Sequence, residues 1–153
     1  MTEQVPAFRA PSPLERTFNR ALGALVGLGL GPRDYYVLQV RGRKSGRLFS
    51  TPVNVIELQG TRFLVAPRGR TQWVRNGDAA GEVALKRGRN VQRFRLRAIP
   101  DIGKPSVLRA YLDRFTATTR RYFPVPAGSP PEAFAAIAPR YPVFELLPLD
   151  QER

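Results

Sequence analysis

Six stretches with the two-residue apolar period of β-strands constrain the fold of this chain more than any other feature. Hairpin turns are expected at Gln59-Gly60 and at 87–90, where glycine permits a tight reversal. A small sheet of this kind is favoured to close into a barrel, because closure removes its exposed edges. The sequence therefore predicts an α+β domain with a closed or partly closed antiparallel barrel. The expected strands are 35–41, 48–58, 61–66, 82–87, 90–99 and 141–147.

Helical periodicity flanks this region and interrupts it once. Residues 1–13 contain three prolines and are expected to form a flexible N-terminal arm, followed by a single domain over 14–153. The inserted helix should be capped by Thr71 and end before Gly81. The expected helices are 14–30, 71–79, 105–122 and 131–138.

One expected strand, 90–99, carries a row of arginines. The side chains expected on its buried face are Val91, Phe94, Leu96 and Ala98. The opposite face presents Arg93, Arg95 and Arg97. Such a row is more typical of a solvated surface than of a binding site.

Positive charge is concentrated in the strand region. The chain has 25 Lys and Arg against 12 Asp and Glu, a formal net charge of +13. Residues 33–97 contain 15 basic and 4 acidic side chains, so this segment carries +11 and the rest only +2. The positive electrostatic potential of such a segment raises the local concentration of anions, whether nucleic acid, anionic lipid or an acidic cofactor.

Histidine and cysteine are both absent. Their absence excludes cysteine nucleophiles, Ser-His dyads, zinc sites of the Cys/His kind and disulfides. No metal site is expected, and no catalytic side chain can be named. If the chain is an enzyme, a bound organic cofactor is expected to supply the reactive group.

Two basic, glycine-containing loops follow strand ends. Gly42-Arg43-Lys44-Ser45-Gly46 joins the first two strands, and its backbone N–H groups, cations and hydroxyl suit a phosphate or a carboxylate-rich ligand. A solvated hairpin tip is an equally good interpretation of this loop alone. The second loop, 66–71, leads into the helix that contains Trp73, and an anion is favoured at that helix N-terminus. Trp73 is interpreted first as a core anchor and second as a ligand contact.

Four motifs in order resemble one known family, the deazaflavin (F420)-dependent nitroreductases and quinone reductases. They are Gly-Arg-Lys-Ser-Gly at 42–46, Thr-Pro-Val at 51–53, Val-Ala-Pro-Arg-Gly at 65–69 and Gln-Trp-Val-Arg-Asn at 72–76. The resemblance covers about 35–99, and 141–146 also fits the family's last strand. It implies a split β-barrel of the FMN/F420-binding type with flanking helices.

The resemblance also implies a function and a site. The expected activity is hydride transfer from reduced F420 to a quinone, a nitroaromatic or another unsaturated acceptor, with FMN as the alternative cofactor. Because F420 carries a phosphate and a polyglutamate tail, the basic loops are expected to hold those anionic groups. Arg47 is a further candidate for the tail, and small hydrophobic acceptors are expected to meet Tyr111 and Tyr122. The residues implied in cofactor binding are Arg43, Lys44, Ser45, Gly46, Pro52, Asn54, Ala66, Pro67, Arg68, Arg70, Trp73 and Asn76.

Alternatives stay open at the level of the sequence. This chain has Gly77 where the family usually has leucine, and its 66–70 loop is short. A non-enzymatic protein that binds the cofactor, a fatty acid or a lipid on the same barrel is the main alternative. Charge alone suggests a nucleic-acid or anionic-membrane binder, but no specific nucleic-acid partner is expected. Without a recognisable secretion signal the expected location is the cytoplasm, with peripheral contact at the inner face of the membrane through 14–30 as a possibility.

Overall fold

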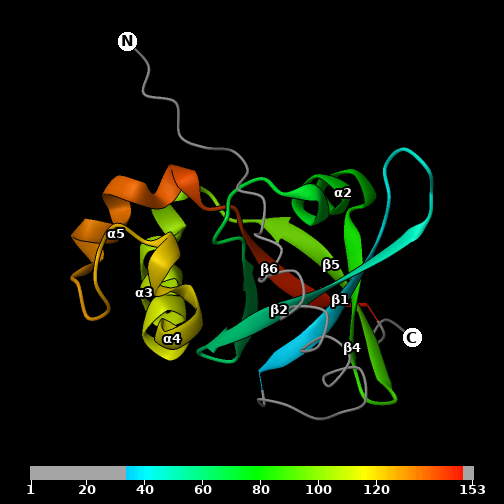
Figure 1. Ribbon diagram of the computed structural model, residues 1–153, viewed down its shortest axis with the longest axis horizontal. Coiled ribbons are helices and arrows are strands. Elements are labelled where there is room, and N and C mark those ends of the chain that lie inside the picture. The colour runs from blue at the N-terminus through cyan, green and yellow to red at the C-terminus, as the bar shows by residue number, and fades with distance from the viewer. Residues whose placement is uncertain (1–33, 150–153) are drawn as a thin grey trace.

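Six antiparallel strands form a closed barrel in the computed structural model, which describes residues 34–149 (Figure 1). Their order around the barrel is β1-β2-β3-β6-β5-β4. The sequence-based prediction of an antiparallel barrel with flanking helices is confirmed. The expected arm at 1–13 and helix at 14–30 lie outside the described residues. The strands are β1 (Tyr35–Arg41), β2 (Leu48–Leu58), β3 (Thr61–Val65), β4 (Glu82–Arg87), β5 (Asn90–Ala98) and β6 (Val143–Pro148).

Three hairpins and three longer-range pairings close the barrel. The β1–β2, β2–β3 and β4–β5 hairpins are local, as the turn residues predict. Strand β1 also pairs with β4, while β6 pairs with β3 on one side and β5 on the other. Because β6 comes from the C-terminal end of the described chain, the barrel closes only after the helical segment has returned to it.

The barrel encloses one of two buried apolar clusters. Leu38, Leu64 and Phe94 are fully buried at its centre. Helix α2 (Gln72–Ala80) packs on this cluster through Val74, which is also fully buried. The helix ends at Gly81, whose φ of 76° is the left-handed conformation that glycine adopts at low cost.

The C-terminal helices lie beside the barrel (Figure 1), and a second apolar cluster contains residues of both. Its aromatic members contact one another, with Phe123 stacked on Tyr141 at a 4.6 Å centroid distance and edge-on to Phe134 at 6.4 Å. The elements that form this helical segment are η1 (Asp101–Gly103), α3 (Pro105–Arg114), α4 (Thr116–Thr119), η2 (Arg120–Tyr122), α5 (Pro131–Ile137) and η3 (Ala138–Arg140).

The prediction of a single helix over 105–122 is wrong, because the helix is interrupted at Phe115. Phe115 leaves helical geometry, with φ −116° and ψ 33°. Threonine hydroxyls on either side of the next turn donate to backbone carbonyls, from Thr116 to Leu112 O at 2.6 Å and from Thr119 to Phe115 O at 2.8 Å. Such back-bonding bends helices, and burial of Phe115 favours the bend. The bend directs 116–122 along one side of the cleft described below.

The expected inward face of β5 is only half correct. Phe94 is fully buried, but Val91 is 52% exposed and Ala98 is exposed as well. Val91 pairs with Lys86 and lies an even number of residues from Arg93, so the alternation along β5 directs it outward with the arginines and not inward with Phe94. The arginines of this strand lie outward as expected, and Arg93 pairs with Glu82 at 2.8 Å.

Candidate functional site

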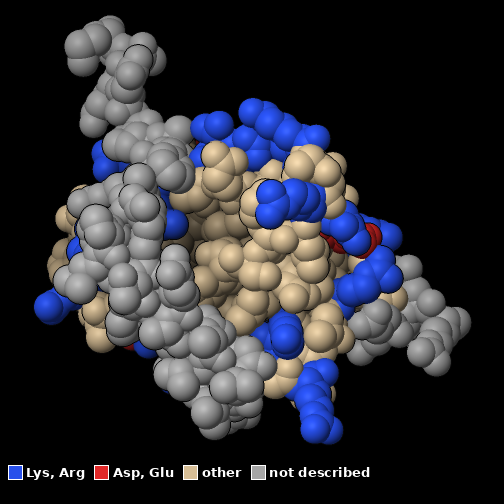
Figure 2. Space-filling model, turned by 45° about the vertical axis from the view of Figure 1, so that its right-hand side comes forward, with Lys and Arg blue, Asp and Glu red and all other residues tan. Residues whose placement is uncertain are grey.

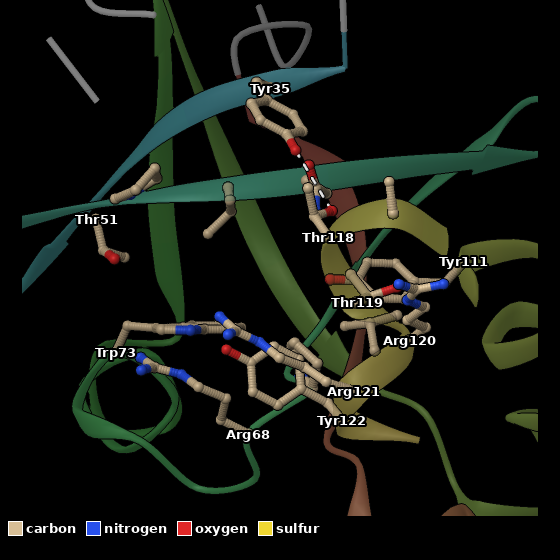
Figure 3. A pocket seen from close by; sticks show the side chains of 16 residues that line it. Tyr35, Thr51, Arg68, Trp73, Tyr111, Thr118, Thr119, Arg120, Arg121 and Tyr122 are labelled. Atoms are coloured by element: carbon tan, nitrogen blue, oxygen red, sulfur yellow. Dashed lines mark hydrogen bonds between the residues drawn. The ribbon is translucent and has the colours of Figure 1, made fainter. Parts of the chain in front are cut away.

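A cleft runs between the barrel and the helical segment, and it consists of two adjoining hollows. The larger is a cavity of about 760 Å³ between β2 and the 117–122 segment (Figure 3). The smaller, of about 450 Å³, lies between the 42–45 loop and the start of α2; we call it the basic groove. Thr51, Arg68 and Trp73 line both hollows, so one extended ligand can occupy the two together.

The first loop forms one side of the basic groove. Gly46 has a φ of 74°, and the loop is closed by a hydrogen bond of 3.0 Å from Arg41 Nη1 to the carbonyl oxygen of Gly46. The Ser45 hydroxyl accepts from the backbone N–H of Arg47 at 3.1 Å, which leaves its own proton for another acceptor. The Lys44 side chain is exposed at the groove and has no hydrogen bond or ion pair within residues 34–149.

Arg43 attaches this loop to α2. Its backbone N–H and its Nη1 both donate to Asn76 Oδ1, at 3.0 and 2.7 Å, and Nη1 also donates to Gln72 Oε1 at 2.9 Å. Asn76 is only 4% exposed, so its amide oxygen is held where both bonds are shielded from water. The resemblance implied a cofactor contact for Arg43, and the structure shows that this side chain also fixes the loop on the helix.

The second loop supplies the opposite side of the groove. Gly69 has a φ of 84°, which permits the sharp turn between β3 and α2. Arg68 is half-buried, lines both hollows and has no hydrogen bond or ion pair within the described chain. The Thr71 hydroxyl is buried and, among the described residues, has no hydrogen-bond partner, although Thr71 occupies the N-cap of α2. The expected capping bond is therefore absent, and a polar atom is left to face the groove.

Three of the residues implied in cofactor binding lie off the cleft. Arg70 forms an ion pair with Asp78 at 2.7 Å and faces a separate hollow beside Lys104. Gly46 and Ala66 line neither hollow, and Ala66 is 1% exposed. Their part in the cleft is to shape the loops that carry their neighbours.

The larger cavity has an apolar floor formed by β2 and the end of β3. Pro52, Asn54 and Pro67 line it, as the motifs predict. The ring of Trp73 packs tilted against Phe144 at 6.0 Å, as a core anchor would, and it also lines the cleft. The flat rings and the polar Asn54 provide a surface suited to a planar heterocycle.

The opposite wall comes from the helical segment, and we call it the helical wall. Tyr111 is buried, and burial raises the pKa of its phenol well above the usual value of 10, although a hydrogen bond with Asn54 acts to lower it. Tyr35 donates from its hydroxyl to Thr118 Oγ1 at 3.4 Å across the cavity. Tyr111 and Tyr122, expected to meet the acceptor, both line this cavity.

Several lining residues escape the sequence analysis. They fall at the C-terminal end of the helix expected at 105–122, or at the start of a strand, where no motif singles them out. Only the bend at Phe115 and the return of the chain bring them to β2. These residues are Tyr35, Thr118, Thr119, Arg120 and Arg121.

The charged side chains that line the cleft from the described part of the chain are all basic. Figure 2 shows Lys and Arg side chains bordering a hollowed area that is otherwise uncharged. Neither hollow is lined by an Asp or Glu among the described residues. The arrangement favours an elongated anionic ligand with a planar, apolar part.

The chain belongs to the F420H2-dependent quinone reductase family, whose profile matches residues 14–123. Membership makes the protein an oxidoreductase with coenzyme F420 as its cofactor, in agreement with the resemblance read from the motifs. It favours the enzymatic interpretation over the non-enzymatic binding protein that the sequence left open. No curated protein sequence matches the chain.

Solved structures share the fold at low identity. The structure of an F420H2-dependent reductase, FDR-A, is 17% identical, with a TM-score of 0.51 over 74% of this chain and 94% of that one. A domain-swapped dimer is 18% identical, with a TM-score of 0.53 over 87% and 92%. Atu2129 of Agrobacterium tumefaciens, of unknown function, is 20% identical, with a TM-score of 0.52 over 92% and 56%. These similarities establish the split-barrel architecture.

No helix within residues 34–149 combines the length and the apolar character needed to cross a bilayer.

Proposed function

We propose that this oxidoreductase uses F420H2 to reduce a small planar quinone, a nitroaromatic or another unsaturated acceptor in the larger cavity. The observation that carries the proposal is the continuity of the two hollows. One is bordered by Lys44 and Arg68, the other has Pro52, Pro67 and Trp73 on its barrel side, and the two meet at Trp73 and Arg68. This division matches a cofactor with an anionic tail and a planar ring.

The basic groove fits the anionic part of F420. The uncommitted donors that face it are the ammonium group of Lys44, the guanidinium of Arg68 and the hydroxyls of Ser45 and Thr71. A buried hydroxyl without a partner is costly, and a phosphate oxygen at the groove is an acceptor that Thr71 can satisfy. The N-terminus of α2, immediately beyond Thr71, favours negative charge at the same place.

The ring of the cofactor is assigned to the floor of the larger cavity. Pro52, Asn54 and Pro67 would support one face of it, and Trp73 would border its edge. When bound, F420H2 supplies a hydride. The protein needs no nucleophile for this chemistry, so its residues orient the two ring systems and exclude water from between them.

The helical wall is assigned to the acceptor. A cavity of about 760 Å³ has room for a monocyclic or bicyclic acceptor above the ring of the cofactor. The hydroxyl of Tyr111, whose pKa burial raises, is hydrogen-bonded with Asn54 on this side of the cavity. Tyr35 and Thr118 join the two walls at the other end of the cavity.

The first test is titration of the protein with F420, followed by its deazaflavin fluorescence, with FMN as the comparison ligand. Lys44→Ala should weaken F420 binding about tenfold, because a charge-assisted bond is lost. Lys86→Ala is the matched control, since Lys86 lies on β4 and lines neither hollow. Anaerobic oxidation of F420H2 by a naphthoquinone and by a nitroaromatic then tests the acceptor class. A protein that binds F420 and reduces no member of either class would contradict the proposal.

A further inference from the structure

We propose that Tyr35 donates a hydrogen bond and then a proton to the acceptor, and that Thr118 restores that proton from solvent. The inference rests on the proposed function, because it names a catalytic side chain in the same cavity. It starts from a requirement of the chemistry. Hydride transfer to a quinone leaves a negative oxygen, and the hydroquinone forms only when that oxygen receives a proton.

The cavity contains few side chains that can supply this proton. The chain has no histidine and no cysteine. No Asp or Glu of residues 34–149 lines the cavity, and its arginines keep their protons. Hydroxyl groups remain, and phenols are the hydroxyls that serve as general acids. The tyrosines of the described chain that line the cavity are Tyr35, Tyr111 and Tyr122.

Tyr35 is a buried phenol that a second hydroxyl links to solvent. Its hydroxyl donates to Thr118 Oγ1 at 3.4 Å, and Thr118 Oγ1 donates to the carbonyl oxygen of Phe115 at 3.3 Å. Tyr35 is 8% exposed, whereas Thr118 is exposed. Figure 3 shows the Tyr35 hydroxyl directed at Thr118, with a dashed line between them. A hydroxyl both donates and accepts, so the pair forms a short path for a proton from water into the cavity.

The position of Tyr35 suits contact with the acceptor. Tyr35 is the register partner of Asn54, and directly opposed residues of an antiparallel pair share one face of the sheet. It therefore lies beside the floor assigned to the cofactor ring, next to an acceptor placed above that ring. Tyr111 is a poorer proton donor, because burial raises the pKa of its phenol and so disfavours its anion.

Neighbouring bonds hold Tyr35 in place without using its hydroxyl. Arg87 Nη1 donates to the carbonyl oxygen of Tyr35 at 2.8 Å. Arg114 donates to Asp34 Oδ2 through Nε and Nη2, at 2.9 and 2.5 Å, which ties the end of α3 to the start of β1. The phenol and the helical wall are thus fixed relative to each other before the acceptor binds.

The proton transfer accompanies reduction of the quinone. The quinone takes up the hydride that F420H2 supplies, which brings two electrons and one hydrogen, and one oxygen becomes negative. The O–H bond of Tyr35 breaks, and its proton forms a new O–H bond on that oxygen. The Thr118 hydroxyl turns from Phe115 to the phenolate and gives it a proton, while Thr118 takes one from water. The products are the hydroquinone and oxidised F420, and both side chains end unchanged.

The first test measures the hydrogen bond without turnover. It uses the infrared carbonyl bands of isotope-labelled 2-methyl-1,4-naphthoquinone bound to the protein in the presence of oxidised F420. A donated hydrogen bond weakens a C=O bond, so one band should lie at lower frequency than in an aprotic solvent. Tyr35→Phe should move that band back, and Tyr36→Phe should not. Tyr36 is the matched control, because it is the next residue of β1 and lines neither hollow.

The second test measures the proton step with F420H2 and the same quinone. Tyr35→Phe should lower kcat about 100-fold, a usual contribution of a general acid, and leave F420 affinity unchanged. Thr118→Val should lower kcat about tenfold, because the path to water is cut. Thr118→Ser keeps the hydroxyl and should restore the rate, which a purely structural role of the threonine methyl group would not allow.

The outcomes separate this inference from the proposed function. If the unchanged protein reduces the quinone and Tyr35→Phe is equally fast, the proposed function stands and the inference is wrong. An equal loss in Tyr36→Phe, or a larger loss in Tyr122→Phe, would also overturn the inference. If the carbonyl band depends on Tyr35 but neither quinones nor nitroaromatics are reduced, the proposed function fails and Tyr35 stands as the donor to the ligand oxygen.

Discussion

The basic groove and the helical wall face each other across one cleft, but they are built in opposite ways. The groove comes from two loops close in sequence, carries cationic side chains, and is fixed by a few hydrogen bonds around Asn76. The wall comes from a distant segment and is held by an apolar cluster of aromatic rings. The positions of the groove's cations thus depend on local motifs, whereas the shape of the helical wall depends on packing. Changes to the two regions should therefore separate cofactor affinity from stability and acceptor binding.

The largest effect is expected from removing an aromatic anchor of the helical wall. Phe134 is fully buried and packs edge-on to Phe123. Phe134→Ala should lower the free energy of unfolding by about 3–5 kcal/mol, through lost burial and the cavity left behind. Urea unfolding measures the change. At temperatures where the variant is folded, F420 affinity should change less than acceptor KM, and the reverse order would contradict the proposed separation.

The next effect is expected at the basic groove. Lys44→Ala/Arg68→Ala should weaken F420 binding by about 100-fold, because two charge-assisted contacts are lost. Calorimetric titration measures the affinity, and the thermal midpoint should hardly move, because neither side chain has a partner within the described residues. The control is Lys86→Ala combined with Arg89→Ala, which removes the same charge away from the cleft. A similar loss in that control would show that the overall field, and not the groove, binds the cofactor.

The ionisation of Tyr111 gives a pH test of the helical wall. Burial raises its pKa in the folded protein, while the unfolded chain keeps a value near 10. Above pH 10 the unfolded state therefore loses the proton first, so the stabilisation is complete below pH 10 and declines as the pH rises further. The expected slope is at most about 1.4 kcal/mol per pH unit. Chemical unfolding between pH 9 and 11 measures it.

Tyr111→Phe is the matched variant for that experiment. Its unfolding free energy should fall less steeply above pH 10 than that of the unchanged protein. Tyr141, whose pKa burial also raises, supplies the residual slope. Parallel curves for the two proteins would contradict a buried, neutral Tyr111.

A smaller effect, opposite in sign for stability and binding, is expected from Thr71→Val. The substitution keeps the shape of the side chain and removes a buried hydroxyl that has no partner among the described residues. Stability should stay the same or rise slightly, because no capping bond is lost. F420 affinity should fall about fivefold if the hydroxyl meets the phosphate. Unchanged F420 affinity would remove Thr71 from the groove's set of donors.

The smallest effect is expected at Gly77. A Cβ there would lie 2.9 Å from Cδ1 of Leu96, the mobile end of a half-buried side chain. Gly77→Ala gains helix propensity of about 1 kcal/mol and loses part of it to the displacement of Leu96. The net change in unfolding free energy should stay within about 1 kcal/mol, with F420 affinity unaltered. A loss above about 2 kcal/mol would show that α2 requires glycine to pack on β5.

The sequence-based predictions agree with the structure where a feature depends on neighbouring residues, and they fail where it depends on tertiary contacts. The hairpins, α2 and the two basic loops were predictable because turn glycines and alternating residues act over a few positions. The break at Phe115 was not, because it depends on threonine back-bonding and on burial of that ring against distant residues. Val91 is a different case, because it lies two residues from Arg93 and three from Phe94, so strict alternation along β5 already places it on the exposed face.

By itself the sequence determined the barrel, the family and the cationic loops for an anionic cofactor, because strand period, turn chemistry and charge are local properties. Only the tertiary structure decided which cations act together. It pairs Arg70 with Asp78 away from the cleft, commits Arg43 to Asn76, and brings Arg120 and Arg121 to the larger cavity. The physical reason is that an ion pair, a buried hydrogen bond or a shared cavity depends on distances in space that spacing along the chain does not specify.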